Sequence, residues 1–88
     1  MFKDIKIKDI KVSLGSLTKT LRKKHKLSQQ ALAEELNVSR ITIQNVEAGK
    51  NYTIDTLLKI LQHFDLLHDL HKEITQSIED SKDTNSLY

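Results

Sequence analysis

The sequence predicts a small all-α domain of five helices, and three features of the chain support this fold class. Proline is absent and glycine occurs only twice in 88 residues, so few positions interrupt a helix. Apolar residues recur at spacings of three and four, as on the buried face of an amphipathic helix. A Ser or Thr precedes three of these stretches, at the position of a helix N-cap. A chain of this length has room for one domain, which buries a modest share of its surface and would gain stability from oligomerisation.

Residues 1–13 are expected to form an N-terminal extended arm or a short strand. The run IKIKDIKV alternates apolar and charged residues with the period of two that is typical of a strand. A lone strand has unpaired edges, so it would need a partner such as its symmetry mate in a second copy. The alternative is a disordered basic leader, because chain termini are often loose.

Residues 14–66 are expected to form the core domain, which starts with a helix over residues 14–25. Leucines spaced three and four apart mark this helix: Leu14, Leu17 and Leu21. Ser28 and Ser39 each fit the N-cap of a short helix, and about three residues separate these two helices. The apolar residues that the two helices turn inward are Leu32, Leu36, Ile43 and Val46.

Three further residues fit special positions around these two helices. Ala33 suits a place where two helices approach closely. Asn37 lies in the turn between them, where a left-handed backbone is needed and asparagine tolerates it better than most residues. Gly49 suits the residue just past the second helix.

Thr53 is expected to cap a fourth helix, and a break near Asp65 separates it from a fifth over residues 67–79. The inward apolar residues of the fourth helix are Ile54, Leu57, Leu58, Leu61 and Phe64. The stripe of the fifth helix is assigned to a dimer or partner contact and consists of Leu67, Leu70, Ile74 and Ile78. Residues 80–88 are expected to be a flexible tail.

The net charge of +2 is unevenly distributed. Residues 1–26 hold nine Lys or Arg against two Asp, whereas residues 53–88 hold three basic and seven acidic residues. A basic amino-terminal part suggests an anionic partner, although a solvated surface is the alternative. The absence of cysteine excludes disulfides and thiolate metal sites. No apolar run approaches the length of a membrane span and no signal peptide is visible, so a cytoplasmic protein without a membrane partner is expected.

The spacing of the two short helices is that of a helix-turn-helix, whose second helix enters the major groove of DNA. The side of that helix turned away from the core carries Arg40, Ile41, Gln44 and Asn45. Arginine can donate two hydrogen bonds to guanine, asparagine or glutamine can pair with adenine, and an exposed isoleucine can pack on a thymine methyl group. A small packing contact or a protein interface is the alternative for Ile41.

The run LSQQALAEELNVSRITIQNVEAGK, residues 27–50, resembles the Cro/C1-type helix-turn-helix family, also called the XRE family. The matching residues are Ser28, Gln29, Ala33, Asn37, Ser39, Ile43, Glu47 and Ala48-Gly49-Lys50. The resemblance covers about residues 14–66 and implies a lambda-repressor-like five-helix domain. The family usually has glycine where Asn37 stands, and neither the amino-terminal arm nor the tail belongs to the core pattern.

The resemblance also implies roles in binding double-stranded DNA. Gln29 would contact a phosphate at the amino end of its helix, and three residues would position the DNA backbone: Ser39, Lys50 and Asn51. The residues that would face the bases are Arg40, Ile41, Thr42, Gln44 and Asn45. Arg22 would form a structural ion pair with Glu47, with a phosphate contact as the competing interpretation.

The predicted function is that of a sequence-specific transcription regulator, a repressor or autoregulator that binds a near-palindromic operator as a homodimer. The run TLLKILQHFDLLHDL resembles the matching segment of HipB-like antitoxins, which implies a kinase-type toxin as a partner. A restriction-modification controller or a phage-type repressor would look much the same. A protein-interaction module that does not bind DNA is the alternative from another functional class.

Other chemistry finds little support in the sequence. His63, His68 and His71 lie near acidic residues, but they lack the spacing of a defined zinc site. No nucleophile, base and orienting residue form a recognisable set, and no glycine-rich phosphate loop is present. Neither an enzyme nor a cofactor is expected.

Overall fold

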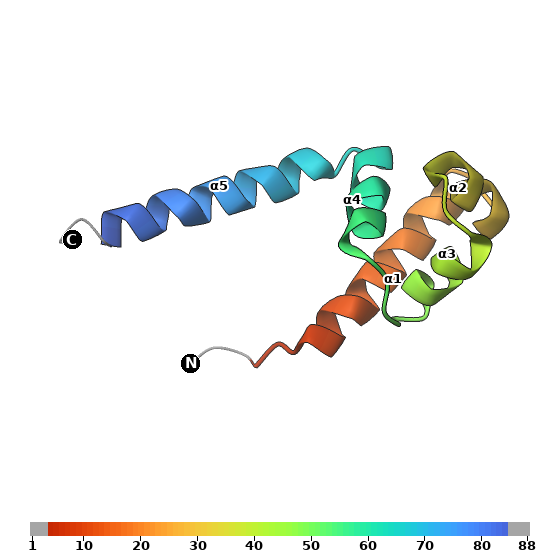
Figure 1. The fold of residues 1–88 in the computed structure, drawn as a ribbon, viewed down its shortest axis with the longest axis horizontal. Coiled ribbons are helices and arrows are strands. Elements are labelled where there is room, and N and C mark those ends of the chain that lie inside the picture. Colours follow the sequence, from red (N-terminus) through yellow and green to blue (C-terminus); the bar gives the residue numbers. More distant parts are fainter. Residues whose placement is uncertain (1–3, 85–88) are drawn as a thin grey trace.

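The computed structural model describes residues 4–84, and this part of the chain forms five α-helices and no strand (Figure 1). The helices are α1 (Ile7–Lys24), α2 (Gln29–Leu36), α3 (Arg40–Glu47), α4 (Ile54–His63) and α5 (Leu67–Thr84). α3 packs against both α1 and α2, α4 packs against α2, and α5 contacts chiefly α4. The predicted all-α class with five helices is therefore confirmed.

The expected arm or strand is wrong from residue 7 onward, because α1 begins at Ile7. The Asp9 carboxylate accepts a hydrogen bond from the backbone N–H of Lys6 at 3.0 Å, which satisfies one amide at the helix start. The apolar residues that alternate in this run also fall at helical spacing with the leucines that follow, so the two periods compete. Residues 4–6 precede the helix, and residues 1–3 lie outside the described part.

The carboxyl-terminal boundary also differs from the expectation. α5 continues to Thr84, so residues 80–84 extend the last helix and do not form a tail. Residues 85–88 of the expected tail lie outside the described part of the chain. No helix among the described residues combines the length and apolar character that crossing a bilayer requires.

The predicted N-caps are confirmed. Ser28, Ser39 and Thr53 each accept a hydrogen bond from the backbone N–H three residues later, with O···N distances of 3.0, 3.1 and 3.3 Å. Replacing such a cap by alanine usually costs about 1 kcal/mol. These three contacts fix where α2, α3 and α4 begin.

The helix ends depend on residues with left-handed backbone. Asn37 closes α2 with φ of 58° and Gly49 follows α3 with φ of 74°, as the sequence predicts. Asp65, at the predicted break between α4 and α5, has φ of 61°. Lys26, which the sequence does not single out, has φ of 59° in the connection between α1 and α2.

The core lies between α2, α3 and α4. Its buried members are Leu32, Ala33, Leu36, Ile43, Val46 and Ile60. Ala33 is fully buried, in agreement with its predicted place at a close helix contact. This core fixes one side of α3 and leaves the opposite side of that helix outside.

α1 and α3 approach each other closely at Gly15, which is buried in the middle of α1. A Cβ atom on Gly15 would lie 2.6 Å from the carbonyl oxygen of Val46 and 2.9 Å from that of Glu47. Both oxygens belong to the backbone, so no side-chain rotation can make room for it. Glycine at this position therefore lets α3 lie directly on α1.

Candidate nucleic-acid interface

The outer side of α3 carries the residues that the sequence assigns to base contacts. Ile43 and Val46 are buried in the core, and this orientation turns Arg40 and Ile41 to the exterior. The Ile41 side chain is 63% exposed, so a packing contact within the described chain does not explain it. The remaining candidates on this helix, Thr42, Gln44 and Asn45, are half-buried.

The amino end of α3 is held by two hydroxyl groups. Ser39 Oγ accepts the backbone N–H of Thr42 and lies 2.8 Å from Thr42 Oγ1. The other amides of this first turn have no partner within their own helix and point along its axis. Such a helix end favours an anion, including a DNA phosphate.

A buried ion pair lies behind this face. Arg22 Nε lies 2.7 Å from Glu47 Oε2, and Arg22 Nη2 lies 3.0 Å from Glu47 Oε1. Arg22 Nη1 also donates to the carbonyl oxygen of Leu27 at 2.9 Å. The two side chains are only 10% and 6% exposed. The structure thus brings together the two residues that the resemblance pairs, and the Arg22 guanidinium is directed into the protein.

Gln29 joins the same carboxylate. Its Nε2 donates to Glu47 Oε1 at 3.0 Å, so the side chain predicted to contact a phosphate is oriented by α3. Burial favours a higher pKa for Glu47, but the hydrogen bonds from Arg22 and Gln29 outweigh it and leave the pKa below its ordinary value. The hydrogen bond to Glu47 raises the pKa of Arg22 in turn. Glu47 therefore stays charged and is neutralised beside the proposed DNA face.

The helices α1, α2 and α3 enclose a polar hollow of about 370 Å³ next to the ion pair. Its lining residues are Lys19, Arg22, Lys23, Gln29, Gln44, Glu47 and Ala48. Lys19 and Lys23 are exposed and one helical turn apart, and they are not among the residues that the sequence predicts to contact DNA. The signal available was their i, i+4 spacing in the most basic part of the chain. Two exposed ammonium groups beside Gln29 suit a phosphate group.

The loop after α3 carries the other two backbone candidates, Lys50 and Asn51, and both are exposed. The ammonium group of Lys11 on α1 donates a hydrogen bond to Asn51 Oδ1. Val12, one residue further on, lies against Gly49. The first turns of α1, which the sequence did not connect with this region, thus support the loop.

The predicted histidines lie on two helices, His63 at the end of α4 and the other two on α5. His63 Nε2 lies 3.4 Å from Glu35 Oε1, and its ring meets Phe64 edge to face at 4.9 Å. His68 and His71 lie on the exposed first turns of α5. No group of three or more potential metal ligands occurs within residues 4–84. These contacts account for His63 without a metal ion.

Comparison with known families supports the helix-turn-helix assignment. A family model described as helix-turn-helix matches residues 19–70, which is more than half of the chain. The match starts within α1 and stops in the first turn of α5, so most of the outer ends of these two helices lie outside it. No curated protein matches the chain.

Proposed function

The chain belongs to the Cro/C1-type (XRE) helix-turn-helix family of DNA-binding transcription regulators, and from this premise we propose that it binds a near-palindromic operator as a homodimer and represses transcription. Repression follows when the bound protein occupies promoter DNA. An autoregulator would place such an operator ahead of its own coding sequence.

The observation that carries this proposal is the outer side of α3. Ile41, which is 63% exposed, lies there beside Arg40. The amide side chains of Gln44 and Asn45 on the same helix are half-buried. Exposure of such an isoleucine to water is unfavourable, and packing against a thymine methyl group would bury its apolar surface. Arg40 can read guanine, and Gln44 and Asn45 can read adenine. In a dimer, two such helices would enter successive major grooves about 34 Å apart.

The first test is the salt dependence of binding to duplex DNA. DNA that co-purifies with the protein supplies the operator, and fluorescence anisotropy measures its affinity at several salt concentrations. We expect log K to fall linearly with log salt, with a slope of about −0.9 for each phosphate neutralised. No binding, or an affinity that does not change with salt, would favour a pure protein-interaction module.

The second test separates base contacts from phosphate contacts. Arg40→Ala and Asn45→Ala are each expected to reduce discrimination between operator and random DNA by about 1–3 kcal/mol without unfolding the protein. Lys50→Ala is the control, because a phosphate contact weakens all sequences nearly equally. The comparison uses both DNAs for all three variants. If Arg40→Ala weakens both DNAs alike, its assignment to a base is wrong.

An antitoxin role is a finer form of the same proposal. Acidic residues on α5 would be repelled by DNA and suit another protein: Asp69, Glu73, Glu79 and Asp80. A kinase-type toxin encoded next to this gene is the partner that the resemblance of residues 56–70 favours. Co-expression with the neighbouring reading frame tests it, with relief of toxicity and a stable complex as the expected results. If neither occurs, the antitoxin role is wrong, and the proposed function as a transcription regulator is unaffected.

A further inference from the structure

Two helices present apolar residues that the domain leaves uncovered near their outer ends. On α1, Ile10 and Ile7 are 49% and 76% exposed, whereas Leu14 and Leu21 on the same side of the helix are half-buried. On α5, Ile74 and Ile78 are 51% and 50% exposed. Water contact at this many neighbouring large apolar side chains is unfavourable and marks an interaction surface.

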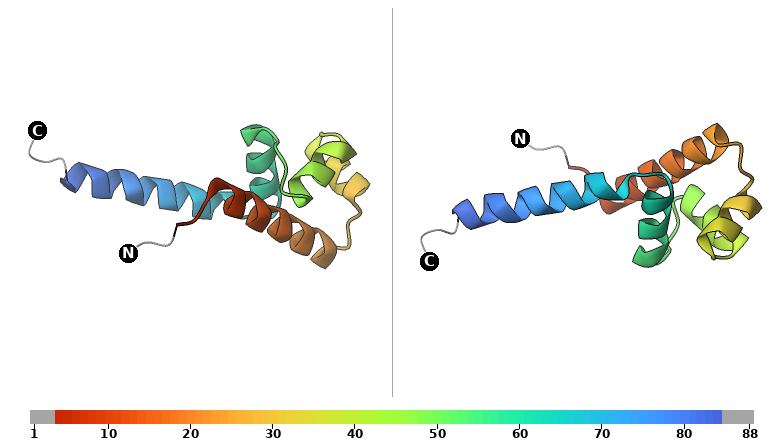
Figure 2. Two further views of the ribbon diagram at one scale, coloured as in Figure 1. Left: turned by 90° about the horizontal axis from the view of Figure 1, so that it is seen from below. Right: turned by 90° about the horizontal axis from the view of Figure 1, so that it is seen from above.

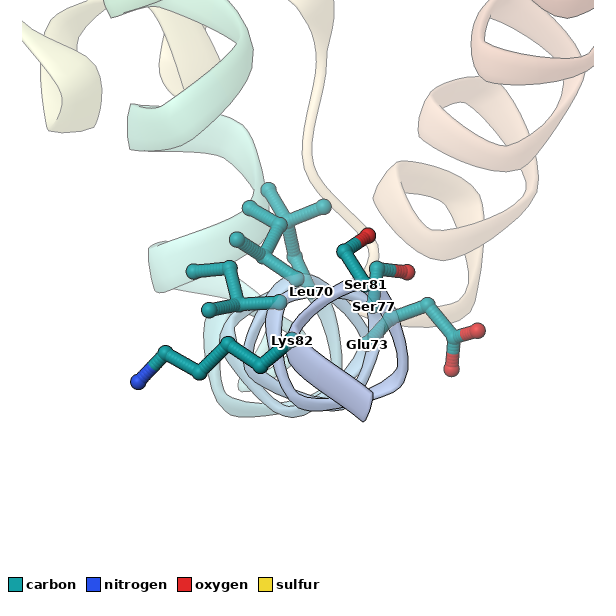
Figure 3. Close-up of a pocket in the computed structure, with 7 residues that line it drawn as sticks. Leu70, Glu73, Ser77, Ser81 and Lys82 are labelled. Atoms are coloured by element: carbon teal, nitrogen blue, oxygen red, sulfur yellow. The ribbon is translucent and has the colours of Figure 1, made fainter. Parts of the chain in front are cut away.

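Both stripes lie on parts of the molecule that extend to the same side. The amino-terminal half of α1 and nearly all of α5 leave the α2–α3–α4 body in one general direction in every view (Figures 1 and 2). Figure 3, seen along α5, shows Leu70, Ser77 and Ser81 on one side of the helix, with Glu73 and Lys82 flanking them. These residues, with Ile74 and Ile78, form one largely exposed face of α5.

We propose that α5 of a second copy packs along the α1 stripe, and that α1 of the second copy packs along α5 of the first. This cross-paired interface rests on the homodimer proposed above and names the surface that forms it. One two-fold axis then covers both stripes of both copies, because an isologous contact repeats each pairing.

The two stripes match in spacing and length. On α1 the stripe positions are Ile7, Ile10, Leu14, Leu17 and Leu21. On α5 the same three-and-four spacing gives Leu67, Leu70, Ile74, Ser77 and Ser81, with Ile78 beside them. Each stripe spans 14 residue steps, or about 21 Å of helix. Repeats of this kind allow knobs-into-holes packing, and the two serines leave room for the larger side chains of α1.

Charge favours α5 of one copy against α1 of the other, and opposes α5 against α5. Residues 4–24 hold seven Lys or Arg and two Asp, whereas residues 67–84 hold two Lys and five Asp or Glu. In the heptad register of the stripes, Lys6 and Lys11 flank the α1 stripe and Glu73 and Asp80 flank that of α5. Opposite charges at these flanking positions select the partner helix in coiled coils. Two α5 helices paired antiparallel would place Glu73 and Asp80 of one copy against those of the other.

The attachment of α5 opposes pairing with α1 of the same chain. Leu67, Leu70 and Ile74 line an apolar hollow of about 250 Å³ together with Leu58 of α4. This contact seats the first turns of α5 on α4, after the left-handed turn at Asp65. The rest of α5 extends to the same side as the start of α1 without packing along it (Figure 1), so a second copy is the occupant that reaches both stripes.

Disulfide trapping tests the pairing directly, because the chain contains no cysteine. Ile10→Cys carrying a size tag is mixed with Leu70→Cys, Ile74→Cys or Ile78→Cys, and the three positions cover the unknown register. We expect a mixed disulfide with at least one of them after mild oxidation. A disulfide between two copies of Ile74→Cys without any mixed product would overturn the pairing. So would a monomeric product from the double variant Ile10→Cys/Ile74→Cys at high dilution.

Sedimentation gives an independent readout. Ile7→Gln/Ile10→Gln is expected to lower the affinity of the dimer about 100-fold or more, because glutamine replaces two isoleucines on each copy that the interface would bury. Ile54→Gln is the control, since Ile54 is 69% exposed on α4 and lies off both stripes. Equal dimer affinity for the two variants, or a wild-type protein that is monomeric at micromolar concentration, contradicts the interface. If the protein still binds DNA in a salt-sensitive way, the proposed regulator function is retained and only the interface is wrong. The two failures can therefore be distinguished.

Discussion

Arg22→Met is expected to lower the melting temperature by more than about 12 °C, the largest effect of any single substitution that we predict. Methionine keeps much of the arginine side chain's length but removes three hydrogen bonds, two to Glu47 and one to the Leu27 carbonyl. Glu47, with a side chain 6% exposed, then stays buried with only Gln29 as a partner. Breaking a buried pair in this way costs about 3–5 kcal/mol, against a total stability of about 5–15 kcal/mol for a typical domain.

Lys23→Met is the matched control, because it makes a similar change one residue away at an exposed position. Circular dichroism against temperature measures both variants. A partial rescue by Arg22→Met/Glu47→Leu would identify the stranded charge as the cause, since an apolar pair can replace a buried ion pair at little cost. Equal shifts for Arg22→Met and Lys23→Met would show that the pair does not stabilise the fold.

Gly15→Ala is expected to destabilise the protein by about 2 kcal/mol, although helix propensity alone predicts a gain of about 1 kcal/mol. The new methyl group would sit 2.6 Å from a backbone oxygen of α3, so the two helices must separate. Their separation strains the core on the other side of α3. Urea unfolding measures the change in stability, and DNA affinity is expected to fall with it because α3 moves.

Ser16→Ala provides the comparison for Gly15→Ala. Ser16 is exposed on the same helix, so alanine there should stabilise by a few tenths of a kcal/mol through propensity alone. A stabilising effect of both alanines would mean that α1 and α3 have room between them.

Features of the fold that depend on neighbouring residues could be predicted from the sequence. The three caps, the left-handed positions at Asn37 and Gly49 and the break near Asp65 follow from local chemistry, and all of them are found. Contacts between distant residues could not be predicted in this way. Nothing near Gly15 in the sequence indicates that a carbonyl of α3 lies against it, and nothing near Lys11 points to Asn51.

The start of α1 shows a different limit. Ile5 and Ile7 are two residues apart, as in a strand, and so are Ile10 and Val12, whereas Ile7 and Ile10 also fall at helical spacing with the leucines that follow. The local alternation favoured the strand, whereas the longer stripe and the Asp9 cap decide for the helix. The candidate site shows the same division: the α3 residues could be predicted from base chemistry, but Lys19 and Lys23 join it only through the folding of α1 beside α2.

The Arg22–Glu47–Gln29 cluster has a consequence for how such a regulator can change its target. One carboxylate ties together α1, α2 and α3 from the inner side of the recognition helix. Within residues 4–84, by contrast, no side-chain hydrogen bond joins Arg40, Gln44 or Asn45 to another residue. These three side chains, which we propose read DNA, thus take no part in the hydrogen bonds that hold the cluster together. New combinations at these outer positions can be exchanged, in evolution or by design, while the scaffold that presents them keeps its shape.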